Sequence, residues 1–283
     1  MEHFDYRGPS RAECRRQGQE VVAILEDGGY DAPSGRRVDL RASVERAVAA
    51  THDHRPEEAV GAPRTPAVRS AKTLVRVVNG TSLASAREMA ARGLVPLVLN
   101  FASARSPGGG FLNGARAQEE SLARCSALYA CLVQSAMYAH HRAADDAVYT
   151  DWMIHSPDVP VFRDDASAEL LEKPYLCSFL TAAAPNAAVA LERDPSRADE
   201  VTDVLIARLR RVLAICAAKG HRQLVLGAWG CGVFRNDPAV VARAFRTELD
   251  GAYAGVFDEI VFAVLDGSEE RRFLRPFVEQ FAA

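Results

Sequence analysis

One nearly unbroken apolar run, Leu94-Val-Pro-Leu-Val-Leu-Asn100, constrains the fold of this chain more than any other feature. A strand without polar alternation is covered on both faces, as it is in a parallel sheet that lies between helices. The surrounding pattern agrees, because strand-like runs at 74–78, 175–181, 223–227 and 257–265 alternate with helical periodicity. We therefore predict an α/β fold with a mostly parallel sheet sandwiched between helices.

The first 70 residues differ from the rest of the chain because they contain helical periodicity without clear strands. Helices are expected at 11–27 and 40–50, and the prolines and glycine of 55–66 indicate a surface connection. We predict a helical N-terminal accessory region over residues 1–70 and the main domain over residues 71–283. Further helices are expected at 82–92, 118–138, 197–219, from Pro238 onward and at 269–281, with short broken strands at 148–162.

The composition is that of a soluble globular protein, with 48% apolar and 25% charged residues. No run of about 18 apolar residues is present, so we expect no membrane-spanning helix. The start of the chain lacks the basic and apolar segments of a secretion signal, and we expect a cytoplasmic location. The net charge of -3 argues against generic binding of duplex nucleic acid, but a small anion could still be held by backbone N–H groups.

The cysteines and histidines do not show the spacing of a metal site. Six cysteines are scattered without a Cys-x-x-Cys pair, and a disulfide framework would be unusual in the expected reducing compartment. His52, His54 and the His140-His141 doublet fall in polar stretches, where we expect solvated side chains. The sequence therefore predicts no metal.

Two glycine-rich loops each follow a predicted strand. Gly108–Gly110 follow the 94–100 strand, and Gly230-Cys-Gly232 follows the 223–227 strand and leads into the helix that begins at Pro238. In α/β sheets, ligands bind beyond the carboxyl ends of strands, and glycine allows consecutive N–H groups to converge on an anion. A helix N-terminus adds a favourable dipole. We interpret both loops as phosphate-binding, the alternative being that each is a turn that requires positive φ.

An acid pair, Glu119-Glu120, follows the first loop at the start of the predicted 118–138 helix. Neighbours on a helix diverge by about 100°, so the two carboxylates cannot serve the same purpose. One can face a bond being broken while the other binds a sugar hydroxyl, and a nearby pyrophosphate would favour a protonated carboxyl. The alternative is that both acids only stabilise the first helical turn, by about 0.3–1 kcal/mol each.

The segment Gly108-Gly-Gly110, followed after seven residues by Gln118-Glu-Glu120, resembles the triglycine and Gln-Glu-Glu signature of poly(ADP-ribose) glycohydrolases. The flanking Leu99-Asn-Phe-Ala-Ser103 and two later blocks, at 149–162 and 227–234, are similar to the compact bacterial branch of that family. The resemblance covers nearly the whole chain. It implies a macrodomain, in which a mixed sheet lies between helices and a cleft binds ADP-ribose.

The resemblance also implies roles for individual residues. Glu120 would be the catalytic acid/base, Glu119 its partner at the ribose hydroxyls, and Asn100 a contact of the distal ribose. We expect Glu120 to donate a proton to the 2′-oxygen of the leaving ribose and then to activate water. No cofactor is implied, and ADP-ribose is the expected product. The implied substrate contacts are Asn100, Gly108, Gly109, Gly110, Phe111, Gln118, Gly230, Cys231, Gly232, Val233 and Phe234.

We predict on this basis a glycosidase that hydrolyses the ribose–ribose O-glycosidic bonds of poly(ADP-ribose). The resemblance to the bacterial branch of the family implies an exo-acting enzyme that releases ADP-ribose, with the N-terminal region blocking a longer polymer beyond the cleft. The expected partners are poly(ADP-ribose) or ADP-ribosylated macromolecules, and the chain is expected to be a monomer. Two alternatives are a mono(ADP-ribosyl) hydrolase acting on protein or DNA, and a macrodomain that binds ADP-ribose without cleaving it.

Overall fold

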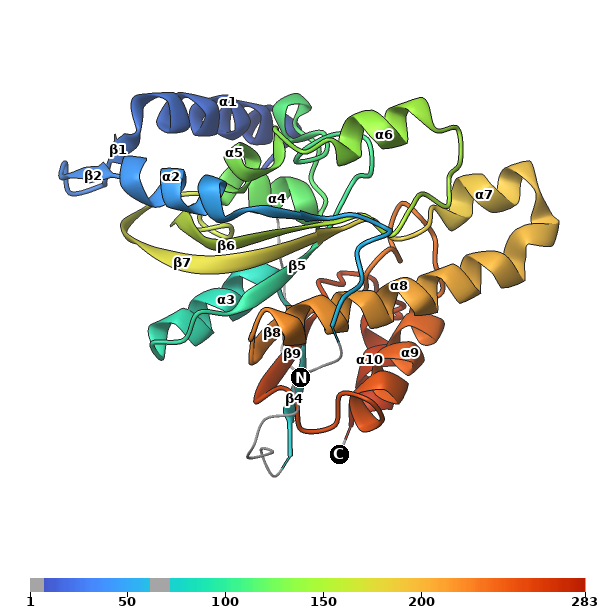
Figure 1. Cartoon of the computed structure of the whole chain (residues 1–283). Helices are drawn as coiled ribbons and strands as arrows, with labels where there is room; N and C mark the ends of the chain where they lie inside the picture. The colour runs from blue at the N-terminus through green and yellow to red at the C-terminus, as the bar shows by residue number, and fades with distance from the viewer. Residues whose placement is uncertain (1–7, 62–71, 283) are drawn as a thin grey trace.

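A computed structural model describes residues 8–61 and 72–282 of the chain. Its centre is a seven-stranded mixed sheet with helices packed against both faces (Figure 1), which confirms the predicted fold class. In spatial order the strands are β3 (His52–His54), β6 (Met153–Arg163), β7 (Leu170–Ala182), β5 (Leu97–Phe101), β8 (Gln223–Leu226), β9 (Glu259–Ala263) and β4 (Leu74–Val78). The strands from β7 to β4 are parallel, whereas β6 is antiparallel to β7 and β3 is antiparallel to β6.

Strand β5 lies in the middle of the core, as its apolar sequence predicts. Leu97 and Leu99 pack on one face of the sheet and Val98 on the other, and all three are fully buried. Covering both faces removes any need for polar alternation along the strand. One face carries α1 (Arg11–Asp27), α2 (Arg41–Ala50), α3 (Ser82–Ala91), α4 (Gln118–Cys125), α5 (Leu128–Leu132) and α6 (Met137–Ala143), and the other carries α8 (Ala198–Ala218), α9 (Pro238–Asp250) and α10 (Leu274–Phe281).

Some elements lie outside these two layers. A two-stranded ribbon follows α1, and two 3₁₀ helices and a short helix connect larger elements. The elements outside the two layers are β1 (Gly29–Asp31), β2 (Arg37–Asp39), η1 (Phe111–Asn113), η2 (Pro195–Arg197) and α7 (Ala187–Arg193).

None of the helices in the described ranges has the length and apolar character needed to cross a membrane.

The single helix predicted at 118–138 is wrong, because three short helices occupy this segment. Ser126 has extended backbone angles (φ -144°, ψ 173°) and forms an isolated bridge with Val161 of β6. Its hydroxyl donates to the carbonyl of Leu122 at 2.7 Å and accepts the N–H of Leu128 at 3.3 Å. Pairing with the sheet therefore breaks the helix at Ser126, although the apolar periodicity of the sequence continues through it.

The N-terminal region contains strands as well as helices. Both predicted helices are present as α1 and α2, but β3 also joins the main sheet by pairing with β6. The N-terminal region therefore completes one edge of the sheet. The predicted domain boundary between residues 70 and 71 lies outside the described residues.

The last helix begins five residues later than the predicted residue 269, at Leu274. The carboxylate of Asp266 accepts the N–H groups of Phe273 at 2.7 Å and Leu274 at 3.1 Å, and it also accepts the N–H of Ser268. These bonds hold the preceding residues in a loop, so helical hydrogen bonding starts only after Phe273.

Candidate active site

A cleft of about 690 Å³ lies at the carboxyl ends of the parallel strands. Its walls include residues 101–103 after β5, residues 228–234 after β8, and residues 263–265 at the end of β9. Residues 80–83 and the N-terminal end of α4, residues 116–122, complete this part of the wall. The position is the one where α/β sheets bind ligands, and the volume lies within the ~300–1,000 Å³ typical of small-molecule sites.

The acid pair opens α4 and lines this cleft. Glu119 is 3% exposed and Glu120 is 8% exposed, and Ala117 at the N-cap provides no capping side chain. Acids that only stabilise a first helical turn are solvated, whereas buried carboxyls need partners or a function. Burial therefore argues against a role limited to the helix dipole.

The triglycine loop packs directly on Glu120. The N–H of Gly110 donates to Oε1 of Glu120 at 2.9 Å, whereas Oε2 is buried and has no hydrogen-bond partner among the described residues. Gly109 has a φ of 61°, and a Cβ at this position would lie 2.3 Å from Oε1 of Glu120. Glycine is required here because no side chain fits between the loop and the carboxyl.

Glu119 is held by different groups. Its Oε2 accepts the N–H of Ser103 at 2.6 Å, and its Oε1 has a long 3.5 Å contact with Nδ2 of Asn100, which also donates to Thr181 at 3.1 Å. Burial raises the pKa of Glu119 well above its ordinary value; the Ser103 N–H opposes this effect, and the adjacent Glu120 carboxylate adds to it. Burial therefore favours the protonated form of the Glu119 carboxyl.

Gln118 connects α4 to β5. Its Oε1 accepts the N–H of Phe101 at 2.9 Å, and its Nε2 donates to the carbonyl of Leu99 at 2.8 Å and to Oγ of Ser82 at 3.1 Å. The amide thus pairs with the end of β5 much as a neighbouring strand would. This arrangement fixes the first turn of α4, and with it the acid pair, against the sheet.

The second glycine-rich loop has a rigid base. Gly230 has a φ of 74°, and a Cβ there would lie 2.5 Å from the Cβ of Ala184 and 2.6 Å from Nδ2 of Asn236. Asn236 donates to the carbonyls of Pro185 and Gly230 at 2.9 and 3.0 Å. These two bonds fix the start of the loop against the chain that follows β7.

The outer part of this loop is open. Val233 is 80% exposed, and no acceptor in the described part of the chain contacts the N–H groups of Gly232, Val233 or Phe234. The carboxylate of Asp237 caps α9 by accepting the N–H of Ala239 at 2.8 Å. Because Asp237 already occupies the helix N-terminus, an anion here would depend on the N–H groups of the loop itself.

The predicted contact residues divide into two groups. Phe111 belongs to the group outside the cleft because it is only 1% exposed and packs on Tyr129, with ring centroids 4.8 Å apart. The predicted residues that line the cleft are Gln118, Glu119, Glu120, Gly230, Cys231, Gly232, Val233 and Phe234. Five predicted contact residues, all within the described part of the chain, do not line the cleft: Asn100, Gly108, Gly109, Gly110 and Phe111.

Some lining residues were missed by the sequence analysis. Asp165 lines the cleft although it is only 8% exposed, and burial raises the pKa of its carboxyl. Thr81 lines it too and is the N-cap of α3. Asp165 lies just beyond the end of β6, where it follows Asp164, and no glycine-rich loop marks it. Other missed residues of the lining are Ser103, Arg116, Arg124, Leu265 and Phe273.

Comparison with known proteins identifies relatives of this chain. The sequence profile of a family described as "Microbial-type PARG, catalytic domain" matches residues 18–164, where PARG stands for poly(ADP-ribose) glycohydrolase. The crystal structure of a poly(ADP-ribose) glycohydrolase from Thermomonospora curvata is 46% identical and has a TM-score of 0.88. The match covers 95% of this chain and 100% of that one. No relative is found among curated proteins.

Two related structures contain ligands. The Thermomonospora curvata enzyme bound to the inhibitor ADP-HPD is 46% identical, with a TM-score of 0.85, and the match covers 95% of this chain and 100% of that chain. The poly(ADP-ribose) glycohydrolase from Deinococcus radiodurans in complex with ADP-ribose is 42% identical, with a TM-score of 0.78. This second match covers 84% of this chain and 96% of that chain.

Proposed function

This chain belongs to the microbial-type poly(ADP-ribose) glycohydrolase family, and on that premise we propose that it hydrolyses the ribose–ribose O-glycosidic bonds of poly(ADP-ribose). We propose Glu120 as the general acid/base. The observation that carries this assignment is the free Oε2 atom of Glu120, a buried carboxyl oxygen without a partner on a residue that lines the cleft. Both oxygens of Glu119, in contrast, already contact N–H donors.

The reaction then needs a single carboxyl that changes roles. Protonated Glu120 donates its proton to the 2′-oxygen of the leaving ribose, and the glycosidic C–O bond breaks with its electron pair remaining on that oxygen. The other ribose, whose anomeric carbon has lost this bond, carries oxocarbenium character at that carbon. Ionised Glu120 then accepts a proton from water as the water oxygen bonds to that carbon. This step restores the protonated carboxyl.

Three residues support the acid. Burial raises the pKa of Glu119 and so favours a protonated carboxyl, which can both donate to and accept from ribose hydroxyls. Asn100 is completely buried behind it, and we propose that Asn100 orients Glu119 rather than contacting ribose in the cleft. Gln118 is likewise a positioning residue, because its whole amide is bonded to β5 and Ser82.

The second glycine-rich loop is the proposed pyrophosphate site. The free N–H groups of Gly232, Val233 and Phe234 form a consecutive donor set on the wall of the cleft. Phe234 is half-buried, and its ring lies 6.1 Å from that of Tyr149, which gives an apolar border to this side. Backbone donors of this kind bind an anion without requiring a positively charged protein.

Substitution of Glu120 tests the function and the assignment together. Glu120→Gln keeps the shape of the side chain but cannot transfer a proton, so we expect cleavage of poly(ADP-ribose) to fall by about 10²–10⁴-fold. Calorimetry should show retained binding of ADP-ribose. Glu192→Gln is the matched control, because Glu192 is exposed and does not line the cleft. Near wild-type turnover of Glu120→Gln would reject the assignment.

We propose exo-cleavage because the N-terminal segment forms part of the cleft wall. Gly8, Pro9 and Cys14 line the cleft, and Nε of Arg11 donates to the carbonyl of Asn113 at 3.3 Å. This packing closes one side and limits the space for polymer on both sides of the bond. Product analysis tests it: free ADP-ribose should appear from the first time points, whereas early intermediate oligomers would indicate endo-cleavage.

Substrate comparisons separate the remaining alternatives. Release from polymer much faster than from mono-ADP-ribosylated protein or DNA supports the proposal, and the reverse order would indicate a mono(ADP-ribosyl) hydrolase. Intact polymer that stays bound would indicate a binding macrodomain. We also propose that the chain acts as a cytoplasmic monomer without a cofactor. The free, buried state of all six cysteines suits a reducing compartment.

A further inference from the structure

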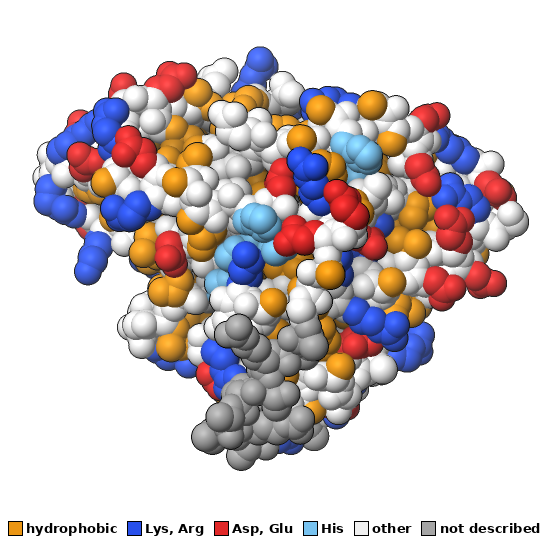
Figure 2. Space-filling view, viewed as in Figure 1, with side chains coloured by type: hydrophobic (Ala, Val, Ile, Leu, Met, Phe, Trp, Pro, Cys, Tyr) orange, Lys and Arg blue, Asp and Glu red, His pale blue; other side chains and the backbone are white. Residues whose placement is uncertain are grey.

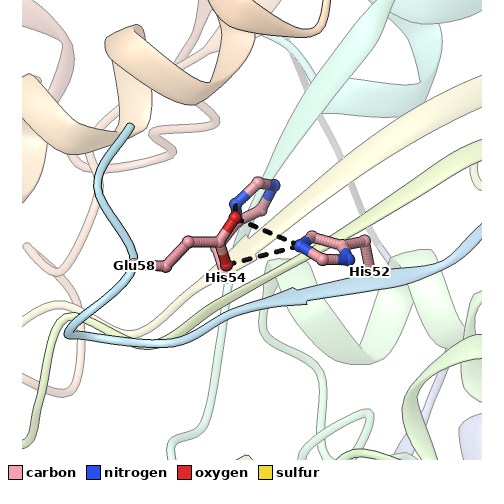
Figure 3. A group of neighbouring side chains, drawn as sticks. All are labelled: His52, His54 and Glu58. Carbon is pink, nitrogen blue, oxygen red and sulfur yellow. Dashed lines mark hydrogen bonds and ion pairs between the residues drawn. The ribbon is translucent and has the colours of Figure 1, made fainter. Parts of the chain in front are cut away.

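We propose that His52, His54 and Glu58 bind a divalent transition-metal ion, with Zn²⁺ as the probe of this class, at a site separate from the cleft. One imidazole nitrogen or carboxylate oxygen from each residue lies within 4.8 Å of the others. Figure 3 shows both imidazole rings directed at the carboxylate of Glu58. None of the three residues lines the cleft.

The local strand structure places both histidines together. His52 and His54 are two residues apart on β3, so their side chains point to the same face of the sheet. Asp53 between them points to the other face, where its carboxylate accepts the hydroxyl of Ser135 at 2.8 Å. The alternation of side chains along a strand thus places two histidines on one face, although the sequence shows no recognised metal-binding motif there.

The third residue is brought back by a fixed turn. The N–H of Glu58 donates to the carbonyl of Arg55 at 3.0 Å. Arg211 of α8 donates to the carbonyl of Glu58 at 3.0 Å and to that of Arg55 at 2.6 Å. The backbone that carries the carboxylate is therefore held by the helix, which reduces the ordering cost of binding an ion.

The distances within the group suit an ion at its centre. Nε2 of His52 lies 3.2 and 3.3 Å from the two carboxylate oxygens of Glu58, and Nδ1 of His54 lies 3.2 Å from one of them. Tetrahedral ligands with bonds of about 2.0–2.1 Å lie about 3.3 Å apart. The same distances are hydrogen bonds between the imidazoles and Glu58 in the structure, and they match the spacing between tetrahedral ligands.

The types of donor atom also suit a cation. His54 is 5% exposed, which corrects the expectation of a solvated side chain. Two imidazole nitrogens with one carboxylate oxygen form a donor set that Zn²⁺, Ni²⁺ and Cu²⁺ accept.

The group is open to solvent on one side. The side chain of His52 is 49% exposed and that of Glu58 is 38% exposed, whereas that of His54 is 7% exposed. Figure 2 shows histidine side chains reaching the surface near the middle of this face, next to acidic side chains. An ion can enter from this side, and three protein ligands leave the fourth tetrahedral position for water.

Metal binding by the full-length, tag-free chain tests the proposal. After treatment with a chelator, calorimetry with Zn²⁺ should show one ion per chain, and Co²⁺ should give the absorption of a tetrahedral site. His52→Ala and Glu58→Gln should each weaken Zn²⁺ binding by at least about 10-fold, because each removes a ligand. Zn²⁺ should raise the thermal midpoint of the wild type but not those of the variants.

His140→Ala is the matched control, because His140 is also an exposed histidine but lies outside the group. It should bind Zn²⁺ like the wild type. All three variants should keep wild-type cleavage of poly(ADP-ribose), so this test is independent of the proposed reaction. Absence of stoichiometric Zn²⁺ binding to the wild type would overturn the proposal. Equal binding by wild type, His52→Ala and Glu58→Gln would overturn it as well.

Discussion

The two glycine-rich loops look alike in sequence but use their backbone donors differently. In the first loop, the N–H of Gly109 donates to the carbonyl of Ser106 at 3.0 Å and that of Gly110 donates to Glu120 at 2.9 Å. In the second loop, no acceptor within the described ranges contacts the N–H groups of residues 232–234. The first loop therefore supports the acid, and the second has donors free for a ligand.

The glycines are also required for different reasons. A Cβ on Gly109 would overlap the Glu120 carboxyl, whereas a Cβ on Gly232 would meet nothing within 4 Å. A glycine cluster after a strand thus does not by itself identify a phosphate site. The two loops differ in whether a protein group occupies the space that a side chain would take.

Gly109→Ala should have the largest effect of the glycine substitutions in the two loops. The added methyl group displaces the Glu120 carboxyl, and we expect kcat to fall by about 10²-fold, as for a catalytic group misplaced by about 1 Å. Steady-state cleavage of poly(ADP-ribose) measures it. Gly35→Ala is the control, because Gly35 has a similar positive φ of 81° but no atom within 4 Å of its Cβ position. An unchanged kcat for Gly109→Ala would contradict the supporting role of the first loop.

Gly230→Ala should act on stability and ligand binding. Strain at positive φ and overlap with Ala184 and Asn236 should lower the free energy of unfolding by about 1–3 kcal/mol. Displacing the base of the second loop should also weaken ADP-ribose binding more than it lowers kcat. Denaturant unfolding and calorimetry measure the two effects. A variant with wild-type stability would show that the base of the loop is not rigid.

Much of this architecture could be predicted from residues whose neighbours in sequence decide their structure. The unbroken apolar run of β5 predicts a strand buried on both faces, and Pro238 correctly predicts the start of α9. Both depend on local chemistry. Family resemblance supplied the remaining step, because the roles proposed for the acid pair depend on a substrate that the residues alone do not specify.

Other features could not be predicted because they depend on contacts between distant segments. The break at Ser126 results from pairing with β6, and Asp165 reaches the cleft only through the path of the chain after that strand. Asn100 follows an apolar run, but its burial and its contact with Glu119 are set by the packing of α4 on β5. The sequence shows which residue types follow each strand, but it does not show which of them face the cleft.

The pH dependence of stability tests the burial of Glu119, the acid next to the one that the first loop supports. The folded-state pKa of Glu119 is raised, so the stability from its protonated form is fully present below the unfolded-state pKa of about 4.3. This stability is lost as pH rises through the folded-state value. The Gln side chain of Glu119→Gln cannot ionise. The thermal midpoint of this variant, relative to that of the wild type, should therefore rise as pH increases. Parallel curves would contradict this, and Glu192→Gln, an exposed control, should give parallel curves.

Gly232→Ala should have the smallest effect. The added methyl group meets no protein atom within 4 Å, and the φ of Gly232 lies outside the positive region, so the free energy of unfolding should change by less than about 0.5 kcal/mol. Denaturant unfolding of Gly232→Ala and Gly230→Ala in parallel compares the two positions within one loop. Weaker ADP-ribose binding at unchanged stability would mean that the ligand occupies the space above Gly232. A stability loss as large as that of Gly230→Ala would show instead that the outer loop is packed, and its N–H groups would then not be free to bind an anion.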